Sequence, residues 1–109
     1  MTKREQAYRD RVRALGCIVC RDLGYGATPA ALHHRRGGTG AARREDESQI
    51  IPLCAIHHQD GDGTATFCGE LAYHRAPKAW EQRYGAQRGM VERTQLEARC
   101  DLLEMVSEY

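Results

Sequence analysis

Two short pairs of metal-binding residues constrain this chain more than any other feature of its sequence. The pairs are Cys17-x-x-Cys20 and Cys54-x-x-His57, and 33 residues separate them. Each two-residue spacer lets both side chains of a pair converge, and three thiolates with one imidazole suit a tetrahedral zinc ion. The alternative is that the first two cysteines are small buried residues and that His57 lies on the surface. The two pairs together favour a structural Zn²⁺ bound by all four residues.

The chain is short and poor in large apolar side chains. Its 109 residues fit one domain, residues 1–109, and only 6% of them are aromatic, with one Trp and one Phe. A chain of this length buries about two-thirds of the surface that its unfolded form exposes. We therefore expect a thin core that needs a bound metal to become stable.

The sequence predicts a cytoplasmic protein without membrane association. It has no run of about 20 apolar residues, and the chain begins without an apolar signal region. Cytoplasmic thiols stay reduced, so the five cysteines are interpreted as metal ligands or core residues and not as disulfides. We interpret Cys100 as a core residue and assign no role to Cys68.

Hydrophobic periodicity and turn residues predict an α+β fold, with helices flanking a short β-hairpin. The last helix carries an apolar stripe that is expected to include Leu96. Gly85 ends the helix before it, which begins with a proline. The predicted elements are helices at residues 3–15, 77–84 and 91–106, strands at residues 30–34 and 49–54, and a helical turn that begins near Cys54.

All five histidines lie between residues 33 and 74, and four of them form adjacent pairs. The pairs are His33-His34 and His57-His58, and His74 follows alone. Neighbouring residues on a helix point about 100° apart. One histidine of the second pair can therefore complete the zinc site while the other faces a second, histidine-rich metal site.

The motifs follow one another in a fixed order between residues 8 and 88, with a core at residues 17–85. This order resembles that of the HNH (ββα-metal, His-Me finger) endonucleases and, among them, the phage recombination-enhancement nucleases called Ref. The motifs are Cys17-x-x-Cys20, His33-His34 before Gly37-Gly38, Ile51-Pro52-Leu53-Cys54 with His57-His58, and His74 before Trp80-Glu81-x-x-Tyr84-Gly85.

The resemblance implies a small zinc-stabilised ββα-metal domain that hydrolyses DNA phosphodiester bonds. By position, His34 matches the general base, while His33, His58 and His74 match ligands of a catalytic divalent metal (Mg²⁺, Mn²⁺ or Zn²⁺). A histidine can accept a proton near neutral pH, and a divalent cation stabilises charge on the phosphate. The family further implies a phage or prophage protein of a bacterial host that acts in recombination on DNA, single-stranded or held in a RecA filament.

Two features of the predicted hairpin affect its histidines. The middle Asn of the HNH motif falls at about Gln49, whose longer amide can still orient the hairpin. A strand directs consecutive side chains to opposite faces, so His33 and His34 reach one site only if the strand ends or bulges there. Otherwise His33 is a structural histidine. His74, for its part, has the alternative of being a surface residue.

Basic residues gather in the first part of the chain. Residues 1–44 contain ten Lys or Arg against three Asp or Glu, and residues 45–109 contain six against twelve. Four arginines follow the proposed catalytic His34. Such a charge run can be a solvated loop, but beside a catalytic residue we expect it to contact DNA phosphates. These arginines are Arg35, Arg36, Arg43 and Arg44.

Two other functions are open at this stage. The chain could be a non-catalytic zinc module that binds DNA or a protein, or a purely structural phage protein that neither cleaves nor binds a second metal. A zinc module has no need of His34, His58 and His74, so these residues favour the endonuclease. The sequence does not indicate an oligomeric state.

Overall fold

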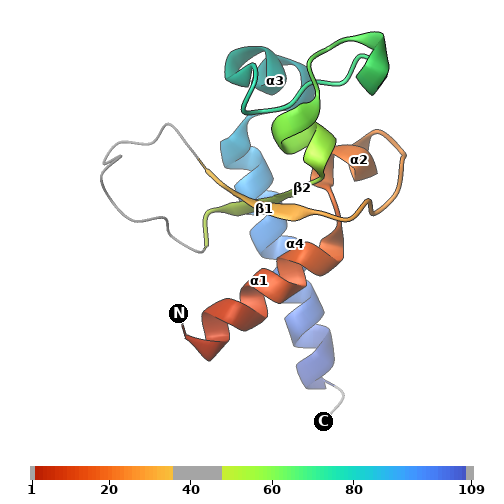
Figure 1. The fold of residues 1–109 in the computed structure, drawn as a ribbon. Helices are drawn as coiled ribbons and strands as arrows, with labels where there is room; N and C mark the ends of the chain where they lie inside the picture. The colour runs from red at the N-terminus through yellow and green to blue at the C-terminus, as the bar shows by residue number, and fades with distance from the viewer. Residues whose placement is uncertain (1, 36–47, 108–109) are drawn as a thin grey trace.

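The computed structural model describes residues 2–35 and 48–107, with side chains described as far as residue 99. It confirms the expected α+β fold, in which helices flank one two-stranded hairpin (Figure 1). Its elements are the α-helices α1 (Lys3–Leu15), α2 (Ile18–Asp22), α3 (Pro77–Tyr84) and α4 (Gln87–Ser107), the strands β1 (Ala31–His34) and β2 (Ile50–Leu53), the π-helix η1 (Ile56–Asp60) and the 3₁₀-helix η2 (Ala65–Phe67).

The hairpin lies at the centre of the molecule and positions both groups of metal-binding residues. Its strands are antiparallel, and His33 pairs with Ile51 while His34 pairs with Ile50. Helices α1 and α4 pack against it on one side, and η1 continues from the end of β2 on the other (Figure 1). All four residues of β2 are buried. Pro52 is tolerated because each strand of a two-stranded sheet is an edge strand.

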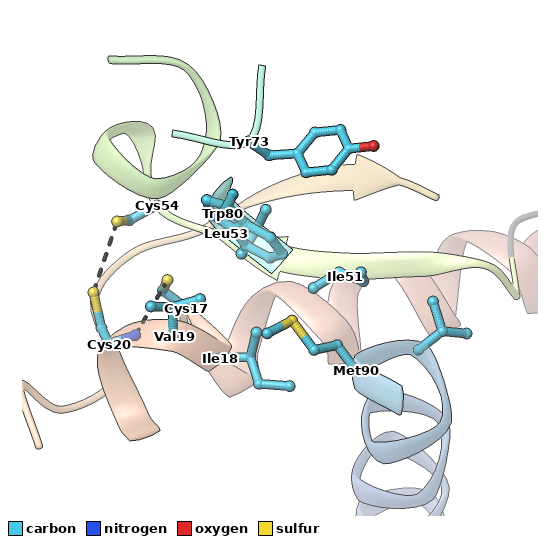
Figure 2. Close-up of a cluster of buried hydrophobic side chains, with 11 residues drawn as sticks. Cys17, Ile18, Val19, Cys20, Ile51, Leu53, Cys54, Tyr73, Trp80 and Met90 are labelled. Atoms are coloured by element: carbon cyan, nitrogen blue, oxygen red, sulfur yellow. Dashed lines mark hydrogen bonds between the residues drawn. The ribbon is translucent and has the colours of Figure 1, made fainter. Parts of the chain in front are cut away.

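The core is small, as expected, and consists of two clusters. One cluster joins α2, β2 and the start of α4 around Trp80, and the three cysteines of the paired motifs lie at its margin (Figure 2). The other joins α1, β2 and the middle of α4 through Val12, Ile50 and Ala98. The metal-binding residues thus supply part of the apolar packing in a chain that has few large side chains.

Local residues fix the ends of helices α1 and α3. Thr2 and Glu5 form a capping box at the start of α1, with hydrogen bonds of 2.8 and 3.0 Å. Helix α1 ends at Gly16, where φ is 80° and an added Cβ would lie 2.6 Å from the backbone of Ala27. Helix α3 begins with Pro77.

Helix α4 differs from the prediction at its start and in its buried face. It begins at Gln87, because the backbone N–H of this residue donates a 2.8 Å hydrogen bond to Glu81 of α3, a cap supplied by another helix. Leu96 is 64% exposed, and Thr94 and Ala98 are buried instead. Packing against α1 and β2 selects that face. Among the described helices, none has the length and apolar character needed to cross a membrane.

Candidate metal centres

The four residues of the paired motifs converge at the ends of three elements. Cys17 caps the N-terminus of α2, where its sulfur accepts a 3.5 Å hydrogen bond from the backbone N–H of Cys20. The first pair therefore occupies the first turn of a short helix that the sequence reasoning did not anticipate. Cys54 follows β2 directly, and His57 lies within η1. The zinc-type cluster thus ties the start of the chain to its middle.

The distances within this cluster fit a tetrahedral zinc ion. The Nδ1 atom of His57 lies 3.2 Å from the Cys54 sulfur, 3.6 Å from the Cys20 sulfur and 3.7 Å from the Cys17 sulfur. The Cys20 and Cys54 sulfurs are 3.7 Å apart. Zn–S and Zn–N bonds of usual length in a tetrahedron separate the ligand atoms by roughly 3.4–3.8 Å. Three of the four distances fall in this range, and the contact of His57 with Cys54 is slightly shorter. The geometry and the S₃N donor set therefore both fit Zn²⁺.

Each of these four residues is at most 5% exposed, so the cluster is closed to solvent. A surface position for His57 is thereby excluded. Hydrogen bonding with the Cys17 thiol, aided by His57, lowers the pKa of Cys54 to about 3. Hydrogen bonding to Cys54 and burial raise the pKa of Cys17, and burial raises that of Cys20. Three thiols this close cannot all ionise without a cation among them, and a bound Zn²⁺ would supply that charge.

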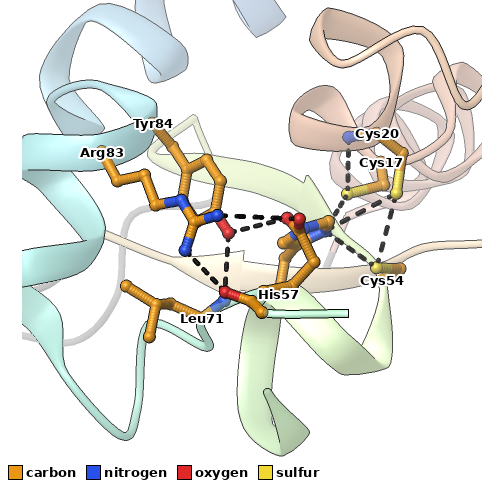
Figure 3. A network of polar contacts seen from close by, with 9 residues as sticks. Cys17, Cys20, Cys54, His57, Leu71, Arg83 and Tyr84 are labelled. Carbon is orange, nitrogen blue, oxygen red and sulfur yellow. Dashed lines mark hydrogen bonds and ion pairs between the residues drawn. The ribbon is translucent and has the colours of Figure 1, made fainter. Parts of the chain in front are cut away.

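A second layer of polar groups orients His57, as Figure 3 shows. The ring presents Nδ1 to the sulfurs, and its Nε2 lies 2.8 Å from a carboxylate oxygen of Glu70. The Tyr84 hydroxyl donates to the same oxygen at 2.8 Å and accepts from the backbone N–H of Leu71 at 3.0 Å. Burial raises the pKa of Glu70, but hydrogen bonds from His57 and Tyr84 outweigh it and lower the pKa. This is the carboxylate–histidine arrangement that supports protein zinc sites.

Three other histidines form a second cluster beside the first. His33 of β1, His58 of η1 and His74 each offer a ring nitrogen, and these atoms all lie within 4.8 Å of one another. The Nε2 atoms of His58 and His74 are 3.1 Å apart. Two nitrogens on one metal ion at usual bond lengths are separated by roughly 3.0–3.4 Å. The donor set and spacing therefore fit a divalent transition metal.

Backbone pairing explains why this second cluster forms next to the first. The N–H of Tyr73 donates to the carbonyl of His57 at 2.9 Å, and the N–H of His74 donates to that of His58 at 3.1 Å. His57 and His58 are consecutive, yet they lie in different clusters. His33 is 1% exposed, His58 is half-buried and His74 is exposed. The histidine cluster is therefore open to solvent on one side.

The strand β1 does not bulge, and its pairing continues to a 2.8 Å hydrogen bond from the Arg35 N–H to the Gln49 carbonyl. His33 nonetheless lies in the histidine cluster, although an unbulged strand favours a purely structural role for it. His34 is the residue at which β1 ends, and it lies outside the ligand cluster. Gln49 closes the hairpin, since its side-chain oxygen also contacts the exposed Arg35 guanidinium at 3.5 Å.

Some predicted site residues lie outside the described part of the chain, and two residues that contact the clusters were not predicted. The other three arginines of the basic loop (Arg36, Arg43 and Arg44) and Gly37-Gly38 lie outside the described residues, as does the side chain of Cys100. Glu70 was not anticipated, and neither was Gln87, which contacts His33 at 2.9 Å. Their partners are 13 and 54 residues away, and no short motif signals a contact at such a distance.

Comparison with known proteins gives one finding. Neither a search of curated proteins nor a search of solved structures produced a significant match. The model of one family, described as "Recombination enhancement, RecA-dependent nuclease", matches residues 1–99. That match covers both metal-type clusters and confirms the resemblance to the Ref nucleases. The chain therefore belongs to the recombination-enhancement, RecA-dependent nuclease family.

Proposed function

We propose that this chain is a metal-dependent HNH endonuclease that hydrolyses DNA phosphodiester bonds at the cluster of His33, His58 and His74. The observation that carries the proposal is the contrast between a closed cluster of four ligands and an adjacent, open cluster of three. Structural zinc sites are closed, whereas catalytic sites combine three protein ligands with an open position for water or substrate. Membership in a nuclease family supports nucleic acid as the substrate.

The three imidazoles of the open cluster favour Zn²⁺ or a similar transition metal over Mg²⁺ and Mn²⁺. Imidazole nitrogen suits Zn²⁺ and similar transition metals, while Mg²⁺ and Mn²⁺ prefer oxygen ligands. A divalent ion held there would stabilise the negative charge that develops on the scissile phosphate and the leaving oxygen. His33 and His58 would hold it from the hairpin and from η1, and His74 would hold it from the exposed side.

His34 is proposed as the general base. It ends β1 directly after the ligand His33 and is not a member of the ligand cluster. Its imidazole would accept a proton as water attacks phosphorus. The bond between phosphorus and the 3′ oxygen would then break, leaving a 5′-phosphate and a 3′ oxygen that is protonated by solvent. The exposed Arg35, next along the chain, would contact a flanking phosphate.

The substrate form is proposed from the family name. RecA-dependent nuclease activity would bring this chain to DNA that is single-stranded or held in a RecA filament. A recombination role in a phage or prophage follows from the same resemblance.

A cleavage assay with and without RecA tests the proposal. Plasmid and single-stranded DNA are incubated with the protein and Zn²⁺, Mn²⁺ or Mg²⁺, and the ends are analysed for 5′-phosphate. His34→Ala should keep its fold and both metals but cut about 10²–10⁴-fold more slowly. His58→Ala should lose the second metal and regain part of its activity when metal is raised. Cys68→Ser, at an exposed thiol, serves as the control.

The outcomes separate the candidate functions. A His34→Ala protein that cuts at the wild-type rate would exclude His34 as the base. A wild-type protein that binds DNA but never cuts it under any of these conditions would favour the non-catalytic zinc module.

A further inference from the structure

A buried glutamine lies behind the open histidine cluster. Gln87 is the first residue of α4 and is 4% exposed. Its side-chain oxygen lies 2.9 Å from the Nε2 of His33, and its side-chain nitrogen donates to the hydroxyl of Tyr73 at 3.0 Å. An amide oxygen only accepts hydrogen bonds. The Nε2 of His33 therefore carries the hydrogen of this contact.

The carboxamide of Gln87 is itself held in place. Its backbone N–H is fixed by the 2.8 Å hydrogen bond to Glu81, so the residue cannot shift without uncapping α4. The ring of Tyr73 lies against that of His33, with centroids 4.6 Å apart and planes inclined at 57°. The His33 ring is thus fixed at one nitrogen and along one side.

We propose that Gln87 is a positioning residue for the catalytic metal, a role that rests on the function proposed above for the histidine cluster. With hydrogen on Nε2, a neutral His33 has its lone pair on Nδ1, and only that nitrogen can bind a metal. Gln87 thereby selects the tautomer of His33 and presents Nδ1 toward the ring nitrogens of His58 and His74.

The residue that contacts the histidine ligand also differs between the two clusters. There the carboxylate of Glu70 contacts His57, whereas here a neutral amide contacts His33. A carboxylate makes a histidine ligand more basic, so the bound metal receives more electron density. A neutral amide orients the ring without that donation. The open site should therefore leave its metal a stronger Lewis acid, as phosphate activation requires.

The first test needs no variant. Nitrogen-15 NMR of the protein carrying only its tightly bound zinc reports the tautomer of each histidine. We expect His33 to carry its hydrogen on Nε2. Hydrogen on Nδ1 instead would overturn the proposal, because that nitrogen would be closed to metal.

The second test measures the affinity of Zn²⁺ for the open site by calorimetry. Gln87→Leu should weaken binding about 10- to 100-fold, the usual effect of removing such a partner. Gln87→Glu should bind at least as tightly as wild type and cut DNA more slowly. Gln95→Leu, which removes another part-buried glutamine of α4, should change neither affinity nor cleavage. Unchanged affinity in Gln87→Leu would overturn the proposal.

Failure of this inference and failure of the proposed function give different results. If the wild type never cuts DNA but Gln87→Leu weakens metal binding, the positioning role stands and the nuclease assignment falls. If the wild type cuts DNA and Gln87→Leu leaves both the tautomer and the affinity unchanged, the positioning role falls and the nuclease assignment stands.

Discussion

The two clusters contain adjacent residues of η1 in opposite surroundings. His57 is buried among three cysteines, whereas His58 is half-buried among histidines at a site that His74 leaves open. A closed site directs metal-binding energy into folding, because the unfolded chain has no preformed site. An open site keeps a position for water or substrate. On the function proposed above, the exposure of the site, the number of protein ligands and their residue type together separate a stabilising metal from a catalytic one.

The geometry of the open cluster should depend on the closed cluster, whereas the closed cluster should not depend on the open one. His58 is held next to His57, and the segment of Tyr73 and His74 pairs with both through backbone hydrogen bonds of 2.9 and 3.1 Å. Loss of the zinc should therefore displace two ligands of the second site. Loss of the exposed His74 side chain should leave the zinc in place.

The largest expected effect follows from removing a zinc ligand. Cys54→Ser should prevent cooperative folding, since structural zinc contributes about 10–16 kcal/mol in small zinc domains. His74→Ala should melt near the wild-type temperature, with one metal fewer. Calorimetric melting and metal analysis of both variants, with Cys68→Ser as the control, test the comparison. A Cys54→Ser protein that melts like the wild type would remove the distinction between the sites.

The next largest effect is the pH dependence of metal affinity, which should differ between the two clusters. The pKa values of Cys17, Cys20 and His57 are raised in the metal-free site, while that of Cys54 is lowered. For His57, burial lowers the pKa, but the hydrogen bonds that its ring donates to Cys54 and Glu70 outweigh burial and raise it. Groups with raised pKa hold protons that zinc must displace, so zinc affinity should rise with pH.

Displacement of about two to three protons predicts a change of roughly two to three decades in zinc affinity per pH unit near neutrality. The histidine cluster contains no thiol, so its metal affinity should change less over the same range. Competition with a chelator at several pH values measures both. Equal slopes for the two sites would contradict the contrast drawn here.

A smaller effect is expected at Glu70, which supports the zinc ligand His57. Glu70→Gln should fold but hold zinc about 10- to 100-fold less tightly, because the ring loses its carboxylate partner. Tyr84→Phe removes a hydrogen bond to the same carboxylate and should have a lesser effect in the same direction. Zinc competition experiments measure both. Wild-type affinity in Glu70→Gln would show that the contact is incidental.

The smallest effect is expected at Arg35. Arg35→Ala should leave metal binding unchanged and reduce the slope of log affinity against log salt by about one, the loss of one phosphate contact. Arg99→Ala is the matched control, because Arg99 is exposed and lies further along α4, about 18 Å from Gln87 at the usual helical rise. DNA binding measured across a salt series tests this, and an unchanged slope would mean that Arg35 is only solvated.

The sequence predicted features whose signals are local. The zinc-type cluster follows from two pairs with fixed spacing, and helix α3 follows from Pro77 and Gly85 at its ends. What it missed depends on contacts between distant segments. Glu81 of α3 caps α4, and packing exposes Leu96. Which face of β1 carries His33 toward the histidine cluster depends on which side of the hairpin the helices cover. A short sequence motif contains no information about that packing.

One measurement tests the two-site account most directly. Zinc is added stepwise to metal-free protein, and bound zinc, folding and DNA cleavage are followed in the same samples. We predict that the first equivalent restores folding without cleavage and that cleavage rises only with the second. We also predict that His58→Ala binds only the first equivalent tightly, stays inactive at two equivalents and regains part of its activity only in a large excess of zinc. Full cleavage at one equivalent, or in His58→Ala at one equivalent, would contradict the account.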